Sequence, residues 1–310
     1  MQAVVICNPV AGGGHGRERM NRLSKIVGRW PWATEIVWTA GPGDGARLAA
    51  RARAAGARWV IAAGGDGTAA EVVNGLLRDG IPDAPGFGYL PIGSGCDFAR
   101  SLDFTSARTV AEKLPDAVTR QVDIGSIEVI ADGGEKVRRL FLNAVNVGLA
   151  SAVLADVRRS RWLSRLGRRS YAAATAIRIL SGGSVSLELS EGGQLVRRGA
   201  ALNLSVCNGA YFGGGLRPCP QADLGSGTLD VAWIEPLPVL EALLQLRRLM
   251  RGAGARHPAV HLLRGRSFEI TGEHVEVEVD GEIPGRLPAR ISVLPGALKV
   301  LAPVRGPRAD

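Results

Sequence analysis

One stretch of the chain combines glycines, an aspartate and a threonine in a spacing that suits the binding of a phosphate group. It reads Gly64-Gly65-Asp66-Gly67-Thr68, and it lies between a short apolar run and apolar residues at helical spacing. A glycine turn between a strand and a helix lets a ligand approach the backbone and points unpaired N–H groups at an anion. The alternative is a tight connection with no ligand. This stretch alone does not decide between the two.

The surrounding sequence favours the ligand. Strand-like runs at Ala3–Cys7, Glu35–Thr39, Trp59–Ala63 and Gly88–Pro91 alternate with helical patterns, which predicts a parallel sheet. The form Thr68-x-x-Glu71 is that of a capping box, so we expect a helix to begin at Thr68. All strand-to-helix loops of such a sheet leave its carboxyl edge, where ligands bind. Here each of these loops is rich in glycine.

Acidic residues accompany these loops, whereas the common nucleotide-binding signatures are missing. The sequence contains no GxxxxGK[ST], and no GxGxxG followed by an acidic residue about 20 positions later. Instead, Asp66 and Asp97 occupy adjacent loop tips, and Asp123 follows in Val-Asp-Ile-Gly. Carboxylates beside a phosphate repel it unless a divalent cation lies between them, so this pattern predicts Mg²⁺. Helix capping is the alternative role for Asp66 and Asp97.

Length and composition set broad limits on the class of protein. The chain has 310 residues and a formal charge of +9, which favours an anionic partner such as a nucleotide, a nucleic acid or an acidic membrane. No apolar run approaches the roughly 18 residues that cross a bilayer, and the amino terminus lacks the features of a signal peptide. The four cysteines show neither a CxxC pair nor zinc spacing, so we expect reduced thiols in a cytosolic protein.

After Gly125 the alternation of strands and helices stops, and closely spaced strands predict an antiparallel β-rich domain. We expect these strands at Arg138–Val147, Val185–Leu189, Ala200–Cys207, Leu229–Ile234, Ser267–Thr271, His274–Val279 and Ala289–Leu294. In the last but one, Val275, Val277 and Val279 should face inward, and Glu276 and Glu278 outward. Asp280-Gly281 then reads as an ordinary hairpin turn.

Two segments in this half are rich in arginine. Arg158–Arg169 mixes arginines with Trp162, Leu163 and Leu166, and we interpret it as facing a membrane. Leu243–Arg251 is amphipathic, and we interpret its leucines as core packing.

In several motifs the sequence resembles the diacylglycerol kinase catalytic family, in particular the bacterial lipid kinases related to sphingosine and ceramide kinases. The matching residues run the length of the chain in the family's order. They are Asn8-Pro9 with Gly12–Gly14, Thr39, Gly64–Thr68 with Glu71–Gly75, Leu90–Arg100, Val122–Gly125, Phe141–Asn143 with Gly148, Tyr211–Gly215, Leu229-Asp230, Val279–Glu282 and Leu294–Leu298.

The resemblance implies an amino-terminal doubly wound α/β domain of the NAD-kinase and diacylglycerol-kinase type over residues 1–125, and a β-sandwich domain that holds the lipid over 126–294. Residues 295–310 form a terminal segment that can return to the first domain. The implied reaction transfers the γ-phosphoryl group of ATP to a lipid hydroxyl with Mg²⁺. The implied nucleotide-binding residues are Asn8, Thr39, Gly64, Gly65, Asp66, Gly67, Thr68, Glu71, Gly93 and Ser94. Asp66, Asp97 and Asp123 organise Mg²⁺, Asp66 and Asp97 are also catalytic, and Glu282 accepts the hydroxyl proton.

The sequence departs from the family pattern at several positions. Ala70 and Cys96 replace asparagines, and Ala150-Ser151 occupy an acidic position. A structural Mg²⁺ site of some relatives corresponds to Asp223, Ser226 and Thr228, of which two lack a carboxylate. An NAD-kinase-like enzyme of a soluble substrate and a non-catalytic lipid- or nucleotide-binding protein therefore stay open as alternatives. The implied partner is a lipid at an anionic membrane surface, contacted peripherally from the cytoplasm, with no nucleic acid. Whether the chain forms a homodimer is open.

Overall fold

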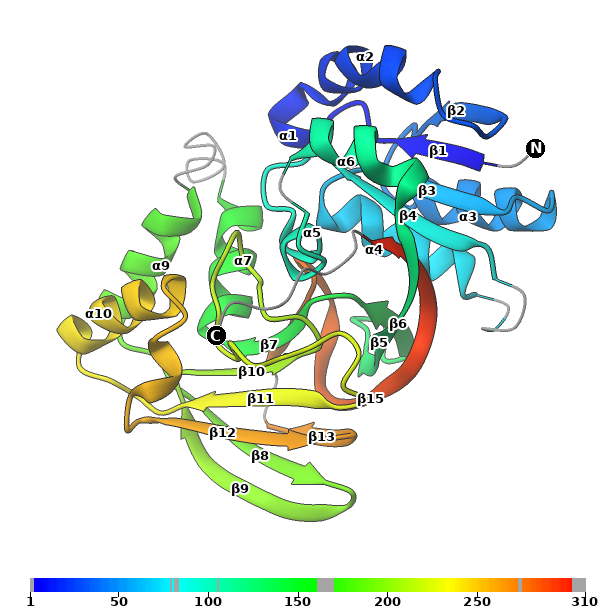
Figure 1. The fold of residues 1–310 in the computed structure, drawn as a ribbon. Coiled ribbons are helices and arrows are strands. Elements are labelled where there is room, and N and C mark those ends of the chain that lie inside the picture. The colour runs from blue at the N-terminus through cyan, green and yellow to red at the C-terminus, as the bar shows by residue number, and fades with distance from the viewer. Residues whose placement is uncertain are drawn as a thin grey trace. The chain divides into compact units, whose positions relative to one another are not determined.

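The computed structural model describes residues 3–78, 80, 84–104, 106–160, 170–272 and 275–302. The chain divides into two compact units (Figure 1): unit 1 comprises Met1–Asp123 and Gly296–Asp310, and unit 2 comprises Ile124–Pro295. These divisions lie within two residues of the boundaries expected at 125 and 294. The chain therefore passes between the units twice.

Unit 1 is a parallel sheet with helices on both faces. Its elements are β1 (Ala3–Cys7), α1 (Ala11–Gly14), α2 (Gly16–Val27), β2 (Thr34–Trp38), α3 (Asp44–Ala54), β3 (Trp59–Gly64), α4 (Asp66–Leu76), β4 (Gly86–Pro91), α5 (Asp97–Ser101), α6 (Ala107–Lys113), the 3₁₀ helix η1 (Leu114–Asp116) and the start of β5 (Val118–Ile130). The strand order is β2-β1-β3-β4. The last part of β15 (Glu282–Ala302) adds a parallel strand beside β4, where Val300 pairs with Phe87. The expected parallel α/β unit is confirmed.

The central strands β1 and β3 are buried at every position because helices cover both of their faces. On one face, α2 and α6 contribute Leu23 and Val110 to a core with Val5 and Ile61. On the other face, α3 and α4 pack against each other (Figure 1). The two-sided cover explains why these strands read as continuous apolar runs rather than as alternating ones.

Unit 2 is a β-sandwich with helices on one side. Its further elements are β6 (Lys136–Phe141), β7 (Ala144–Gly148), α7 (Leu149–Arg159), α9 (Ser170–Ser181), β8 (Val185–Glu191), β9 (Gln194–Ala201), β10 (Asn203–Cys207), β11 (Leu229–Ile234), α10 (Val239–Met250), the 3₁₀ helix η3 (Gly254–Arg256), β12 (Val260–Gly265), β13 (Ser267–Thr271) and β14 (Glu276–Val279). One layer has the order β12-β11-β10-β7-β14-β15, and the other has the order β9-β8-β13-β15-β5-β6. β15 belongs to both layers, because it pairs first with β14 and then with β13.

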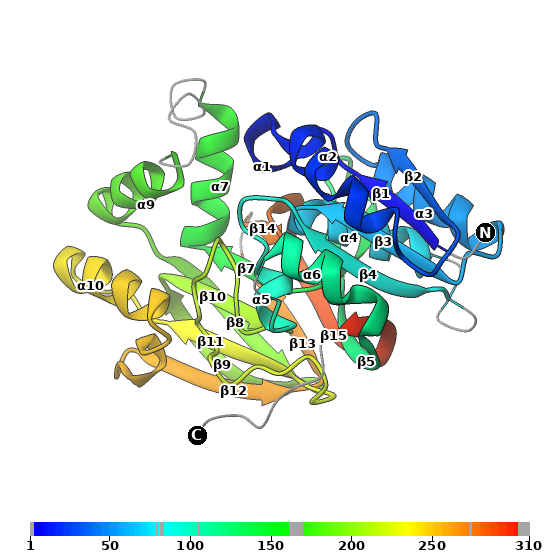
Figure 2. The ribbon, with the colours of Figure 1, turned by 45° about the horizontal axis from the view of Figure 1, so that its top comes forward.

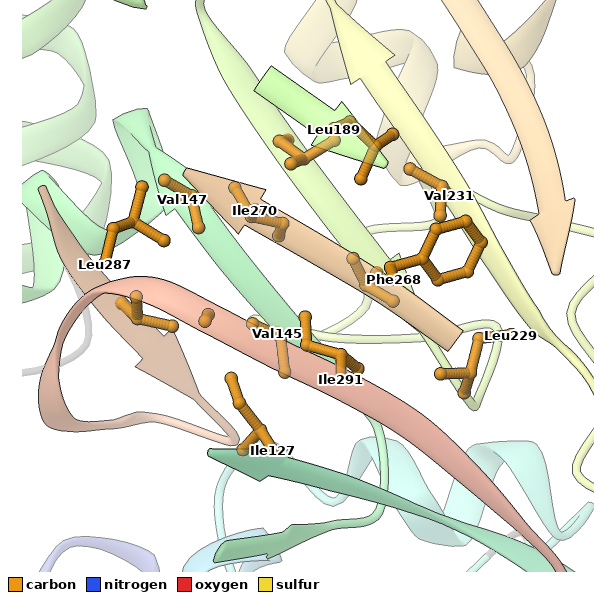
Figure 3. Packing of buried hydrophobic residues seen from close by; sticks show 14 of the residues in the cluster. Ile127, Val145, Val147, Leu189, Leu229, Val231, Phe268, Ile270, Leu287 and Ile291 are labelled. Carbon is orange, nitrogen blue, oxygen red and sulfur yellow. The ribbon is translucent and has the colours of Figure 1, made fainter. Parts of the chain in front are cut away.

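The core of unit 2 lies between these layers (Figure 3). Val145, Val147 and Val231 from the first layer meet Phe268 and Ile270 from the second. The far face of the first layer is covered by helices: α7 packs on β7 and β14, and α9 packs against α7 and α10 (Figure 2).

Three expectations about local structure were wrong, the third of them in part. The strand expected at Arg138–Val147 is two strands, with a break at Leu142 and Asn143. α4 begins at Asp66 rather than at Thr68. The third expectation, that the leucines of Leu243–Arg251 are core packing, holds only for Leu249, which is buried, whereas Leu243 and Leu244 are exposed. In the segment Arg158–Arg169, residues 161–169 lie outside the described residues.

Candidate phosphoryl-transfer site

Two loops at the carboxyl edge of the unit 1 sheet are in direct contact. The N–H of Gly93, after β4, donates to the carbonyl of Gly64 at the end of β3, at 2.8 Å. A Cβ atom on Gly93 would lie 2.3 Å from the Cα of Gly65, so no other residue fits there without moving the backbone. The glycines at these positions therefore allow two strand-to-helix loops to pack as one surface.

Side chains tie the remaining loops to this surface. Asn8, after β1, donates from Nδ2 to the hydroxyl oxygen of Thr68 on α4, at 3.1 Å. Glu71 accepts the N–H groups of Gly43, just before α3, and Gly45, in the first turn of α3, at 2.8 and 2.9 Å. Glu71 thus holds the loop after β2, and the expected capping box with Thr68 does not form. Thr39 is buried, and its N–H donates to the carbonyl of Cys7 at 2.9 Å.

Asp66 and Asp97 are brought together as the sequence predicted, and in a more specific way. The Asp66 carboxylate accepts the N–H of Asp97 at 3.0 Å and that of Phe98 at 2.9 Å, so it caps α5 from another loop. Asp97 is buried and forms an ion pair with Arg100. Helix capping, the alternative role, therefore applies to Asp66.

Capping does not use up the Asp66 carboxylate, because its Oδ2 accepts the N–H of Asp97 and an oxygen can accept two bonds. An atom attached to Gly95 as a Cβ would lie 3.1 Å from Asp66 Oδ2 and 4.0 Å from Asp97 Oδ2. Both oxygens thus border the same space beside a residue without a side chain. Because each carboxylate oxygen accepts two bonds, one N–H on an oxygen leaves a position for a cation. One or two carboxylates with phosphate oxygens are a usual Mg²⁺ set, so the residues fit a magnesium–nucleotide complex.

The remaining predicted residues of unit 1 differ in their exposure. Ser94 is exposed on the loop after β4, next to Gly93. Asp123 is buried, and its carboxylate accepts the N–H of Gly296 at 2.8 Å. That bond joins the two points at which the chain leaves and re-enters unit 1. The position of Cys96 is left-handed, with φ of 56°, a conformation in which asparagine is enriched.

In unit 2, Glu282 follows a two-residue turn. Asp280 and Gly281 have φ of 46° and 88°, which is the type I′ pattern expected of Asp-Gly. Val279 pairs with Glu282 across this turn, and the side chain of Glu282 is exposed. The N–H of Gly281 donates to Glu278, and its carbonyl accepts a bond from Arg158 at 2.8 Å. The backbone beside Glu282 is therefore held in place.

Asp280 does more than form a turn, in contrast to its interpretation as an ordinary turn residue. Its carboxylate accepts three backbone N–H groups, from Leu142 at 2.6 Å, Asn143 at 3.0 Å and Ala144 at 3.1 Å. These groups lie at the break between β6 and β7, so Asp280 replaces the partner strand there. The side-chain oxygen of Asn143 is buried and has no hydrogen-bond partner among the described residues.

A buried polar row beneath α7 was missed by the sequence reasoning. Asn146, on β7, donates to Glu278 on β14 and accepts from Ser205 on β10, at 2.6 Å from the Ser205 hydroxyl. Glu278 was expected to face solvent, but it is only 7% exposed because α7 covers that face of the sheet. Burial, and secondarily the charge of Asp280, raises the pKa of Glu278 to about 7 despite its hydrogen bonds from Asn146 and Gly281. The polar residues at alternate positions of three strands were the signal in the sequence.

The loop that corresponds to a structural metal site in some relatives is closed by its own hydrogen bonds. The Ser226 hydroxyl lies 3.0 Å from the Thr228 hydroxyl, and Asp223 accepts the N–H of Gly225 at 3.0 Å. One carboxylate and two mutually bonded hydroxyls are a poor set of ligands for a hard cation. Among the residues that the structure describes, no group of three His, Cys, Asp or Glu side chains could hold a metal.

A parallel α/β unit with glycine loops and paired carboxylates, joined to a β-sandwich, defines the NAD-kinase and diacylglycerol-kinase class of fold. Two family models match the chain in succession. The model of the diacylglycerol kinase catalytic domain matches residues 2–127, and that of the YegS C-terminal NAD kinase beta sandwich-like domain matches residues 143–302.

Similar proteins agree with these matches. A "Probable lipid kinase YegS-like" of Pseudomonas syringae pv. syringae (strain B728a) is 32% identical over 308 residues, which cover 94% of this chain and 93% of that protein. A protein of the same name from Pseudomonas aeruginosa (strain UCBPP-PA14) is 32% identical over 278 residues, covering 89% and 86%. The crystal structure of a diacylglycerol kinase from Bacillus anthracis str. Sterne superimposes with a TM-score of 0.78 over 97% of this chain and 96% of that chain. At 22% identity it supports the fold alone.

The chain belongs to the YegS-like lipid kinase family, whose amino-terminal part is a diacylglycerol kinase catalytic domain. The family resemblance drawn from the motifs is thereby confirmed. No helix among the described residues has both the length and the apolar character needed to span a membrane.

Proposed function

We propose that this protein transfers the γ-phosphoryl group of ATP to the hydroxyl of a diacylglycerol-like lipid, with Mg²⁺. The observation that carries the proposal is the pair Asp66 and Asp97, whose carboxylate oxygens border one space beside Gly95 at the edge of a glycine-loop sheet. The family of the chain supports the lipid substrate.

The loops of unit 1 supply the nucleotide site. The N–H groups of the first turn of α4, which begins at Asp66, lack partners within the helix and would bind phosphate oxygens. Asn8, Thr39, Thr68 and Ser94 provide polar groups around them, while Gly64, Gly65, Gly67 and Gly93 leave the backbone accessible. Glu71 acts indirectly, since it holds the loop after β2 through two N–H groups.

The chemical step depends on positioning and on neutralisation of charge. Mg²⁺, when bound, neutralises charge on the phosphate oxygens. Asp66 and Asp97 would hold the cation, and Asp123 would support the same polar network from the end of unit 1. Glu282 would accept the proton of the lipid hydroxyl, which is a poor nucleophile until that proton has an acceptor. Asp66 is the alternative acceptor.

The setting of the reaction follows from its substrate. We place the enzyme in the cytoplasm in peripheral contact with an anionic membrane, without a nucleic-acid partner, because a diacylglycerol-like lipid resides in a bilayer and the chain carries a formal charge of +9.

The experiment is a transfer assay with γ-labelled ATP and Mg²⁺ on the purified protein. The acceptors are diacylglycerol, ceramide, sphingosine and phosphatidylglycerol in mixed micelles, and NAD in solution. Label in a lipid supports the proposal. Label in NAD alone identifies an NAD-kinase-like enzyme, and ATP binding without transfer to any acceptor identifies a non-catalytic binding protein. Lipid co-purified with the protein, identified by mass spectrometry, narrows the acceptor.

A further inference from the structure

The helices α9 and α10 are neighbours (Figures 1 and 2). Exposed apolar side chains are concentrated on these two helices. Of the twelve large hydrophobic side chains that are exposed in the described part of the chain, seven lie on these helices. Leu180 on α9 is 67% exposed, and Leu240 and Met250 on α10 are 70% and 62% exposed. Single exposed apolar residues are ordinary, but a group of this size on adjacent helices marks an interaction surface.

The exposure on α10 follows one helix face. Leu240, Leu243, Leu244, Arg247 and Arg251 have the spacing i, i+3, i+4, i+7 and i+11, and all five are exposed. The opposite face holds the helix in unit 2, where the three buried residues Ala242, Gln245 and Leu249 lie. Gln245 donates to the carbonyl of Gly254 at 2.7 Å. The apolar side chains on the outer face are therefore not needed to hold α10 in place.

The charges on and beside this face are mostly basic. α10 and the residue after it carry Arg247, Arg248 and Arg251 against the single acidic residue Glu241. On α9, the charge of Arg178 is already used, because its guanidinium binds both carboxylate oxygens of Asp156. An apolar face bordered by arginines is complementary to a lipid surface with anionic headgroups, which accepts leucines below the headgroups and arginines among them.

We propose that the surface formed by Ile177 and Leu180 of α9 and by the outer face of α10 docks on an anionic lipid bilayer. The proposal deepens the proposed function and rests on it for its purpose, since a diacylglycerol-like substrate resides in a membrane. A second copy of the chain fits this surface less well. A two-fold interface joins the same patch of both copies, so it would bring together two faces that each carry an excess of arginine, and like charges repel.

The assignment differs from the sequence-based interpretation, which placed the membrane contact on Arg158–Arg169. Of the arginines there that the structure describes, Arg158 donates to the carbonyl of Gly281 and Arg159 forms an ion pair with Glu276. Both side chains therefore have partners inside unit 2, whereas the arginines of α10 accompany an apolar face.

The first test measures the apolar contribution by flotation of the full chain with vesicles. The vesicles contain phosphatidylcholine with about 30% phosphatidylglycerol, an anionic fraction high enough for strong attraction of basic residues. We expect Leu240→Ser with Leu244→Ser to weaken binding by at least about tenfold, because membrane affinity scales with the apolar area inserted. The matched control is Leu195→Ser with Val196→Ser on β9, where both residues are also exposed. This control should bind as the wild type does.

The second test measures the charge contribution. Arg247→Gln with Arg251→Gln should weaken binding by about thirtyfold at low salt, since each basic residue at an anionic surface contributes about fivefold. Arg29→Gln with Arg51→Gln lowers the net charge equally at exposed positions of unit 1 and should have little effect. Vesicles of phosphatidylcholine alone should bind weakly, and added salt should reduce the difference between the two vesicle types.

Two results would overturn the proposal. One is vesicle binding by the α10 variants that equals that of their controls. The other is a wild-type dimer in sedimentation equilibrium that Leu240→Ser with Leu244→Ser dissociates, without vesicle binding, which would assign the surface to a second copy. Transfer to a short-chain, water-soluble diacylglycerol separates this proposal from the proposed function. The α10 variants should keep transfer to the soluble diacylglycerol. If the wild type lacks this transfer but floats with vesicles, the proposed function is refuted and the docking surface is not.

Discussion

Asp280 offers a sharp test of how unit 2 is held together. Its carboxylate accepts the N–H of Leu142 on one oxygen, and those of Asn143 and Ala144 on the other. In Asp280→Asn the amide oxygen can keep two of these bonds, but the amide nitrogen is a donor and must face the third N–H. Asparagine tolerates the left-handed backbone at this position, so the turn itself is preserved.

The expected cost follows from these bonds. An N–H that loses its acceptor costs about 1–3 kcal/mol, and each bond that loses a charged acceptor weakens by about 1 kcal/mol. We therefore expect Asp280→Asn to lower the free energy of unfolding of unit 2 by about 3 kcal/mol, which corresponds to a fall of about 6–12 °C in Tm for a domain of this size. Urea titration and hydrogen exchange by mass spectrometry measure the effect. The amides of Leu142–Ala144 should exchange about 150-fold faster if they open with the unit.

A second Asp-Gly turn in the same unit provides the control. Asp132, before Gly133, has a side chain that is 87% exposed and lies 3.6 Å from Arg286. Asp132→Asn should change stability by less than about 0.5 kcal/mol, because exposed ion pairs contribute little. If Asp280→Asn is as stable as Asp132→Asn and its amides exchange at the wild-type rate, the three bonds do not stabilise unit 2 and the reasoning fails.

Three further outcomes are expected. Glu282→Gln keeps the size of the side chain but cannot accept a proton, so kcat for lipid phosphorylation should fall by about 10²–10⁴-fold with the KM for ATP nearly unchanged. A loss below about threefold would show that Glu282 is not the base. Asp66→Asn should abolish magnesium-dependent turnover and lower the stability of unit 1 by about 1–2 kcal/mol, because Asp66 also caps α5; wild-type turnover would reduce it to a structural residue. The pKa of about 7 for Glu278 lies above the value of about 4.3 for an unfolded chain, so the folded state binds a proton that the unfolded state lacks between these pH values. The free energy of unfolding should therefore fall, by on the order of 3 kcal/mol, as pH rises through that window, and Glu278→Gln should flatten the profile; parallel profiles for the two proteins would contradict this.

The sequence predicted best those strands whose burial is visible in their own hydrophobic pattern. The strands Leu229–Ile234 and Ser267–Thr271 were expected with the bounds that the structure has. The first is buried at every position, and the second alternates buried Phe268 and Ile270 with polar residues, so each shows a clear strand pattern. β9 was expected only at its last two residues. It is an edge strand that, in the described part of the chain, pairs only with β8, so most of its side chains are exposed and no hydrophobic alternation marks it.

The larger errors concern residues whose partners are distant in the chain. The alternation of valine and glutamate in β14 correctly predicted that Val277 and Val279 face the core. It could not reveal that α7 covers the opposite face and buries Glu278. In the same way, Asp280 reads as a turn former by its neighbours, and only the fold brings the break between β6 and β7 to its carboxylate. Local patterns report one face of an element, whereas burial depends on both.

The return of β15 to unit 1 has a consequence for the order in which the protein is made. The parallel sheet gains its last strand only when residues 296–302 arrive, after the whole of unit 2 has been translated. Until then β4 has an open edge, and an open strand edge invites pairing with other chains. The sheet of unit 1 is therefore completed only near the end of translation. An early stop, or a later proteolytic cut before Gly296, would leave the edge of β4 open to aggregation. Unit 2 is in this sense an insertion into unit 1, and the hydrogen bond from Gly296 to Asp123 joins the two ends of unit 1 between which it is inserted.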